Sequence, residues 1–144
     1  MATNPYEVEE YVRWEDIDAA GIINYQAYLR FFALAEAELF RHAGLTYKRL
    51  FDEIGIFLPR KRVECNFHQP VRLDDLLVVA ARIGHIGRTS LRIDFEVRRR
   101  GETTLVADGC YVLVSVGHSD FKPCPLPEEV REKLAQFTEP SAIA

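Results

Sequence analysis

The chain has 144 residues, of which 48% are hydrophobic and 28% charged, and this balance is typical of one globular domain. A formal net charge of −4 argues against a nucleic-acid-binding protein, and no apolar run is long enough to span a membrane. Cys65, Cys110 and Cys124 show neither disulfide-framework nor zinc-site spacing, so we expect no metal and a reducing, cytoplasmic location.

Residues 6–14 alternate between apolar and polar side chains, which predicts a half-buried strand. Its inward face would carry Tyr6, Val8, Val12 and Trp14. An acidic turn follows directly, with the carboxylates Glu15, Asp16 and Asp18.

The next segment, residues 26–42, is the most apolar helix-like stretch of the chain. Asn24 is the expected N-cap, and Gly44 stands where a left-handed residue would end the helix. The apolar side chains occupy every side of the helical wheel, so we expect other elements to surround this helix; they are Tyr28, Leu29, Phe31, Phe32, Leu34, Leu39 and Phe40.

The acidic turn therefore lies just ahead of the N-terminus of a buried helix, where unpaired N–H groups carry about half a positive charge. These acids either complement the helix dipole at the surface or belong to a site that polarises a carbonyl and attacks it. Asp16 would be a partner of Asp18 or a solvated turn residue.

The rest of the chain predicts a short helix at residues 46–54, four strands, and a C-terminal helix from Pro127 to about Phe137. The strands cover residues 57–69, 76–86, 88–100 and 103–116, and Gly109 in the last leaves room for close packing. The fold class is α+β, with one antiparallel sheet of about five strands wrapped around the long helix. We expect a single domain over residues 1–137 and a frayed tail over residues 138–144.

The segment DIDAAGIINYQAYLRFF resembles the signature of the hotdog-fold acyl-CoA thioesterases of the 4-hydroxybenzoyl-CoA thioesterase family. The likeness continues in order through VECNFHQPVRLDDLL, HIGRTSLRIDFEV, LVADGCYVLVSV and FKPCPLP, and covers roughly residues 6–130. It implies the hotdog fold and an acyl-CoA substrate bound between two protomers. Coenzyme A would be part of the substrate, with no metal or redox cofactor.

At matching positions the resemblance makes Asp18 the catalytic carboxylate and gives the backbone N–H of Tyr25 the task of polarising the thioester carbonyl. Two positions differ from the family pattern. Tyr25 stands where many relatives carry histidine, and Ala33 stands where relatives often carry glutamate. Asp18 would either attack the thioester or activate water, and the sequence does not choose between these mechanisms.

Other residues are candidates for binding the substrate. Asn24 caps the helix or touches substrate, Tyr28 and Pro59 would line the acyl pocket, and Lys122 lies in a loop expected near the nucleotide. Arg88, Thr89 and Ser90 form a turn suited to phosphate or pantetheine, or else an ordinary hairpin turn. The basic runs at residues 60–62 and 98–100 are solvated faces or phosphate contacts.

The leading function is therefore hydrolysis of an acyl-CoA thioester. The alternatives are a hotdog hydratase or dehydratase, which would want a histidine near the helix start, and a non-catalytic acyl-CoA-binding protein. Open sheet edges also predict a homodimer, or a homotetramer built as a dimer of dimers. The acyl chain length and the aromatic character of the substrate do not follow from the sequence.

Overall fold

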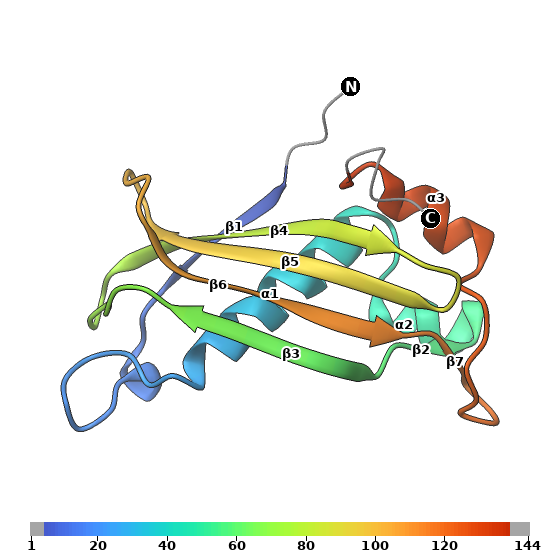
Figure 1. The fold of residues 1–144 in the computed structure, drawn as a ribbon, viewed down its shortest axis with the longest axis horizontal. Coiled ribbons are helices and arrows are strands. Elements are labelled where there is room, and N and C mark those ends of the chain that lie inside the picture. Colours follow the sequence, from blue (N-terminus) through green and yellow to red (C-terminus); the bar gives the residue numbers. More distant parts are fainter. Residues whose placement is uncertain (1–4, 139–144) are drawn as a thin grey trace.

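A computed structural model describes residues 5–138 and contains one five-stranded antiparallel sheet in the order β1-β4-β5-β6-β3 (Figure 1). The long helix α1 crosses one face of this sheet. The predicted α+β architecture is therefore confirmed. The strands are β1 (Tyr6–Tyr11), β2 (Ile56–Phe57), β3 (Arg60–Phe67), β4 (Leu76–Ile86), β5 (Ser90–Arg99), β6 (Leu105–Val114) and β7 (Val116–Gly117), and the α-helices are α1 (Ala27–His42), α2 (Tyr47–Arg49) and α3 (Glu128–Ala135).

Helix α1 fills the concave side of the sheet with aromatic side chains. Phe31 and Phe32 are fully buried, and the Phe32 ring stacks on Phe95 of β5 at 4.5 Å between centroids. However, Leu29 and Ala33 on another side of the helix are exposed. The expectation that other elements surround α1 is thus wrong for one protomer, because the sheet covers only part of its circumference.

The helix begins two residues later than an N-cap at Asn24 would place it. Gln26 occupies the N-cap position and makes no side-chain capping bond. Asn24, the expected N-cap, instead accepts a hydrogen bond from the N–H of Gln26 through Oδ1 at 2.9 Å and so shapes the turn before the helix. The end is as predicted, since Gly44 follows with a φ of +79°.

The first strand is shorter than its alternation implied. β1 ends at Tyr11, and Trp14 lies in a 3-10 turn (Trp14–Asp16) with 80% of its surface exposed. The inward placement of Trp14 is therefore wrong. The turn redirects the chain before the alternation reaches this residue, so its side chain no longer follows the pleat.

The central strands of the sheet have the burial that their sequence patterns predict. The alternate residues Leu91, Ile93, Phe95 and Val97 of β5 are all buried. Gly109 of β6 is needed for packing, because a Cβ there would lie 2.0 Å from the carbonyl oxygen of Glu64 on β3.

Strand β3 forms one edge of the sheet and is mostly exposed. Val63 and Phe67 are 48% and 54% exposed. They belong to the sheet face that α1 covers, as the contact of Phe67 with Tyr28 shows, but the helix does not reach over the edge strand.

The second helical segment and the C-terminal helix lie where the sequence predicts them. The Oγ1 of Thr46 accepts a hydrogen bond from the N–H of Arg49, and the π-helical turn Leu50–Ile54 stops at Gly55 with a φ of +85°. Pro127 directly precedes α3 rather than opening it. Thr138, expected in the frayed tail, is buried and bridges to Ile83 of β4, whereas residues 139–144 lie outside the described part of the chain.

Candidate active site

The acidic turn forms a loop at the lower left of Figure 1, beside the N-terminus of α1. A bridge between Ile17 and Ile23 joins its two sides, and the N–H of Asp18 donates to the carbonyl oxygen of Ile22 at 3.0 Å. Gly21 permits the reversal with a φ of +78°. The Oδ1 of Asp18 accepts a hydrogen bond from the N–H of Ala20 at 2.8 Å, so the carboxylate has a fixed direction at an exposed position.

Asp18 and Tyr25 line the same pocket, which has a volume of about 460 Å³. Most of its wall is apolar, and Tyr28 and Phe67 pack against each other there with ring centroids 5.5 Å apart. Burial raises the pKa of the Tyr28 hydroxyl to about 12, so this hydroxyl stays protonated at neutral pH. The complete lining comprises Asp18, Ile22, Ile23, Tyr25, Tyr28, Phe67, His68, Gln69 and Pro70.

The backbone N–H of Tyr25 is free to bind a ligand. The neighbouring N–H groups of Asn24, Gln26 and Ala27 each have an acceptor, and none of the hydrogen bonds within residues 5–138 uses the N–H of Tyr25. An unpaired N–H at the start of a helix attracts negative charge. Tyr25 therefore combines a place in the lining of this pocket with a backbone N–H that has no acceptor within residues 5–138.

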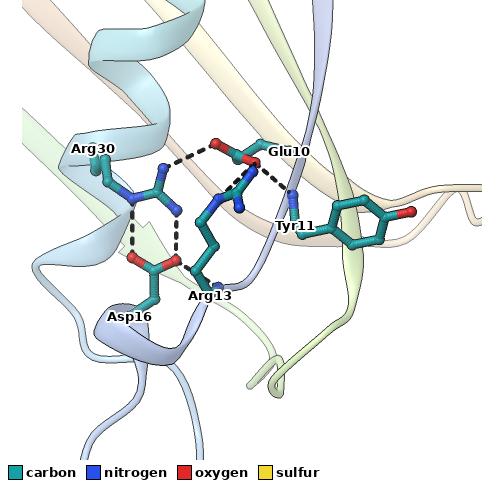
Figure 2. Close-up of polar contacts among 5 residues, drawn as sticks. All are labelled: Glu10, Tyr11, Arg13, Asp16 and Arg30. Carbon is teal, nitrogen blue, oxygen red and sulfur yellow. Dashed lines mark hydrogen bonds and ion pairs between the residues drawn. The ribbon is translucent and has the colours of Figure 1, made fainter.

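Asp16 has a structural position rather than a solvated one. Only 2% of its surface is exposed, and the guanidinium of Arg30 on α1 donates to both carboxylate oxygens, at 2.9 and 2.5 Å (Figure 2). The idea that Asp16 is a solvated turn residue is thus wrong. Sequence reasoning also overlooked Arg30, whose only signal was a single charge among the apolar residues of the first half of α1.

The predicted coenzyme A contacts lie at the other end of the sheet. The turn with Arg88, Thr89 and Ser90 is held by backbone bonds from Leu126 to Arg88 and from Ser115 to Thr89. Lys122 lies in the adjoining loop, and the carbonyl of Pro59 bonds to Val114. Strand β3 separates this group from Asp18, since it runs from Arg60 near Pro59 to Phe67 in the pocket, a length of roughly 20 Å.

Two further polar groups were not singled out by the sequence. His68 lines the pocket and lies 3.2 Å from the Oδ2 of Asp108 through Nε2. Glu36, fully buried on α1, forms an ion pair with Arg60 at 2.5 Å and accepts a hydrogen bond from the Tyr47 hydroxyl. Within residues 5–138 no group of three or more His, Cys, Asp or Glu side chains is arranged to hold a metal ion.

The family comparison decides what kind of protein this is. The model of the thioesterase-like superfamily matches residues 12–134, which includes the acidic turn, α1 and every strand except β1. The chain belongs to the thioesterase-like superfamily. This confirms the family resemblance inferred from the sequence motifs.

Curated relatives of this thioesterase span nearly its whole length. The acyl-CoA thioester hydrolase YbgC of Escherichia coli O6:H1 is 30% identical over 87% of this chain and 92% of its own. A 1,4-dihydroxy-2-naphthoyl-CoA hydrolase of Synechococcus sp. CC9605 is 26% identical over 90% of both chains.

The solved structures identify the fold of the thioesterase. A 1,4-dihydroxy-2-naphthoyl-CoA thioesterase from Synechocystis superposes with a TM-score of 0.84 over 90% of this chain and 95% of its own, at 20% sequence identity. The sheet wrapped on α1 is therefore the hotdog fold, as predicted. No helix in residues 5–138 has the length and apolar character needed to cross a membrane.

Proposed function

We propose that this thioesterase hydrolyses acyl-CoA thioesters with Asp18 as the catalytic carboxylate and the backbone N–H of Tyr25 as the donor to the thioester carbonyl. One observation carries the proposal: a carboxylate without an ion pair among the described residues and a residue with a free N–H line the same pocket. Acyl-CoA hydrolysis follows from the superfamily and from relatives that match about 90% of the chain.

The chemistry requires little more than these two groups. As the carbonyl carbon is attacked, negative charge develops on its oxygen, and a fixed N–H at a helix start stabilises this charge without reorganisation. A thiolate leaves readily, so strong acid assistance is unnecessary. Asp18 either attacks the carbonyl carbon, expels the coenzyme A thiolate and leaves a mixed anhydride that water then hydrolyses, or it removes a proton from the water that attacks the thioester. Neither route needs a metal or redox cofactor.

The apolar wall of the pocket suits the acyl group. Tyr28 and Phe67 would pack against it, while Asn24 would hold the turn that presents the Tyr25 N–H. Relatives act on 1,4-dihydroxy-2-naphthoyl-CoA or are described as acyl-CoA hydrolases without a named acyl group. Both aromatic and aliphatic acyl groups are therefore candidates for this chain.

The coenzyme A moiety would be bound by a second protomer. Arg88, Thr89, Ser90, Lys122 and Pro59 lie at the opposite end of the sheet from Asp18 within one chain. Antiparallel pairing of two β3 edge strands would bring the Arg60 end of one protomer beside the Phe67 end of its partner. We therefore propose a homodimer with two equivalent sites, and a homotetramer if two dimers pair.

The location inside the cell remains a prediction. Cys65, Cys110 and Cys124 are free thiols in the structure, which fits a reducing compartment such as the cytoplasm.

The test is release of free coenzyme A thiol from a panel of aryl-, short-chain and long-chain acyl-CoAs. On the best substrate, Asp18→Asn should lower kcat on the order of 10²-fold or more, because it removes the nucleophile or general base. Asp74→Asn, an exposed turn acid outside the pocket, is the control and should retain full activity. Turnover by Asp18→Asn close to that of the wild type would contradict the assignment.

The same panel, extended by a 2-enoyl-CoA, separates the alternatives. A hydratase would change the absorbance of a 2-enoyl-CoA without releasing thiol, and a binding protein would retain acyl-CoA unchanged. Either result would replace hydrolysis as the function. The histidine expected for a hydratase is absent from the helix start, where the chain has Asn24 and Tyr25.

A further inference from the structure

Asp16, which lies two residues before the proposed catalytic carboxylate of Asp18, forms an ion pair with Arg30 of α1. Figure 2 shows the Asp16 carboxylate facing the guanidinium of Arg30, with the two side chains coming from the 3-10 turn and from α1. Both oxygens are engaged, at 2.9 Å to Nε and 2.5 Å to Nη2. Two parallel charge-assisted bonds fix direction as well as distance.

Asp16 also joins two other segments of the chain. Its Oδ2 accepts a hydrogen bond from the backbone N–H of Arg13 at 2.8 Å, which attaches the end of the β1 segment. Its carbonyl oxygen accepts a hydrogen bond from the N–H of Asn24 at 2.6 Å. Asn24 immediately precedes Tyr25, so the two sides of the loop that carry Asp18 and the Tyr25 N–H both depend on Asp16.

The charges of this cluster balance without Asp18. The outer edge of the Arg30 guanidinium binds Glu10 at 3.0 Å, and Glu10 also binds Arg13 at 2.7 Å. Two guanidinium groups thus face two carboxylates. Burial would raise the pKa of Glu10, but hydrogen bonds from Arg13, Arg30 and the Tyr11 N–H outweigh it and lower that pKa.

Asp16 is consequently unavailable as a base, because its two oxygens accept three hydrogen bonds and its charge is paired. In contrast, the one hydrogen bond to the Asp18 side chain comes from Ala20, and no ion pair within residues 5–138 includes Asp18. The two acids of the turn therefore have different roles despite their similar sequence positions.

We propose that Asp16 and Arg30 are positioning residues that set the separation between the Asp18 carboxylate and the Tyr25 N–H. This inference rests on the proposed function of Asp18 and Tyr25. A displacement of about 1 Å between reacting groups can cost on the order of 10²-fold in rate. Loss of the ion pair should therefore lower kcat, with little effect on KM, because the proposed coenzyme A contacts belong to the partner protomer and are not attached to this loop.

The experiment compares four variants at equal folded concentration: Asp16→Asn, Arg30→Met, Arg30→Lys and Glu10→Gln. Asp16→Asn and Arg30→Met should each lower kcat by about 10- to 100-fold with KM within about threefold of wild type. Arg30→Lys retains the charge without the paired geometry and should fall between Arg30→Met and wild type. Glu10→Gln removes the ion pair between Glu10 and Arg30. The Glu10 side chain does not contact the loop that carries Asp18, so this variant should retain wild-type kcat.

Two further measurements separate positioning from general destabilisation. Amide hydrogen exchange at Asn24 should become faster in Asp16→Asn and Arg30→Met but not in Glu10→Gln, because the Asn24 N–H bonds to the Asp16 carbonyl. The double variant Asp16→Asn/Arg30→Met should lose no more kcat than the worse single variant, since both changes break one contact.

The outcomes are distinct from those that test the function itself. A wild-type protein that turns over no acyl-CoA contradicts the proposed function, and the Asn24 exchange still tests the attachment. An active wild type with Asp16→Asn and Arg30→Met within twofold of its kcat would overturn the positioning role. A kcat loss in Glu10→Gln equal to that in Asp16→Asn would overturn it as well.

Discussion

Buried carboxylates have partners that their sequence positions do not reveal. Glu36 reads as one polar residue on an apolar helix, yet it is fully buried against Arg60 of β3 and Tyr47 of α2. Its second oxygen, Oε1, has no protein partner within residues 5–138. Burial and the neighbouring carboxylate raise the pKa of Tyr47, which keeps its hydroxyl a donor. The positive charge of Arg60 therefore compensates the buried negative charge of Glu36.

Removing Arg60 should destabilise the fold. Arg60→Met leaves the Glu36 charge buried with only a neutral donor, and we expect a loss of about 2 kcal/mol in the free energy of unfolding, below the usual 3–5 kcal/mol because the Arg60 side chain is partly exposed. Urea denaturation measures this loss.

The control for Arg60 lies on the same strand. Arg62→Met removes an exposed ion pair with Glu64 and should change stability by less than about 0.5 kcal/mol. Equal losses in Arg60→Met and Arg62→Met would show that the Glu36 pair contributes nothing beyond a surface ion pair.

At the scale of elements, the contact between β3 and β6 depends on one glycine. A Cβ at Gly109 would meet the Glu64 carbonyl at 2.0 Å and the Phe32 ring at 2.9 Å. The first obstacle is backbone and the second is a buried ring. Neither can move without shifting the edge strand or the helix.

Gly109→Ala should therefore destabilise the protein by roughly 1–3 kcal/mol, the range for overpacking. Gly84→Ala on β4 is the matched control, because its Cβ would meet only the flexible ends of the Asp94 and Arg92 side chains. We expect a smaller loss for Gly84→Ala in thermal and urea unfolding. If Gly84→Ala cost as much as Gly109→Ala, close backbone packing would not be the reason for glycine at position 109.

The elements themselves could be predicted because periodicity records local burial. β4, β5 and α1 have clear patterns, and Gly44, Gly55 and Gly109 mark real turns and contacts. The errors on the edge strand and on the exposed side of α1 share one cause, which is that a pattern does not show how far a neighbouring element extends. Val63 on β3 has an inward position, but α1 stops short of that edge.

The candidate site was less accessible to sequence reasoning than the fold. Asp18 and Tyr25 follow from a motif, whereas the pairing of Asp16 with Arg30 joins residues 14 positions apart on different elements. The same limit applies to Glu36 and Arg60, which are 24 positions apart. Such pairs depend on tertiary packing, so no local spacing announces them.

For the whole molecule, the exposed apolar surface identifies where a second copy would bind. On β4, the outward residues Val78 and Ala80 are almost fully buried between neighbouring strands, so the apolar character of this strand does not call for a partner. The exposed apolar side chains instead include Val63 and Phe67 on the edge strand and Leu29 on α1. An open edge with apolar side chains is normally paired or covered.

Assembly and activity should therefore be lost together. Val63→Lys places a charge on the β3 edge, which opposes strand pairing, and should convert a dimer to a species of 16.5 kDa. Activity should vanish rather than halve, because each proposed site takes Asp18 from one protomer and its coenzyme A contacts from the partner. Tyr11→Lys on β1, the opposite edge of the sheet and also exposed, is the control and should remain dimeric and active. Sedimentation equilibrium beside turnover over a dilution series provides both readouts, and a fully active 16.5 kDa species would show that one protomer holds a complete site.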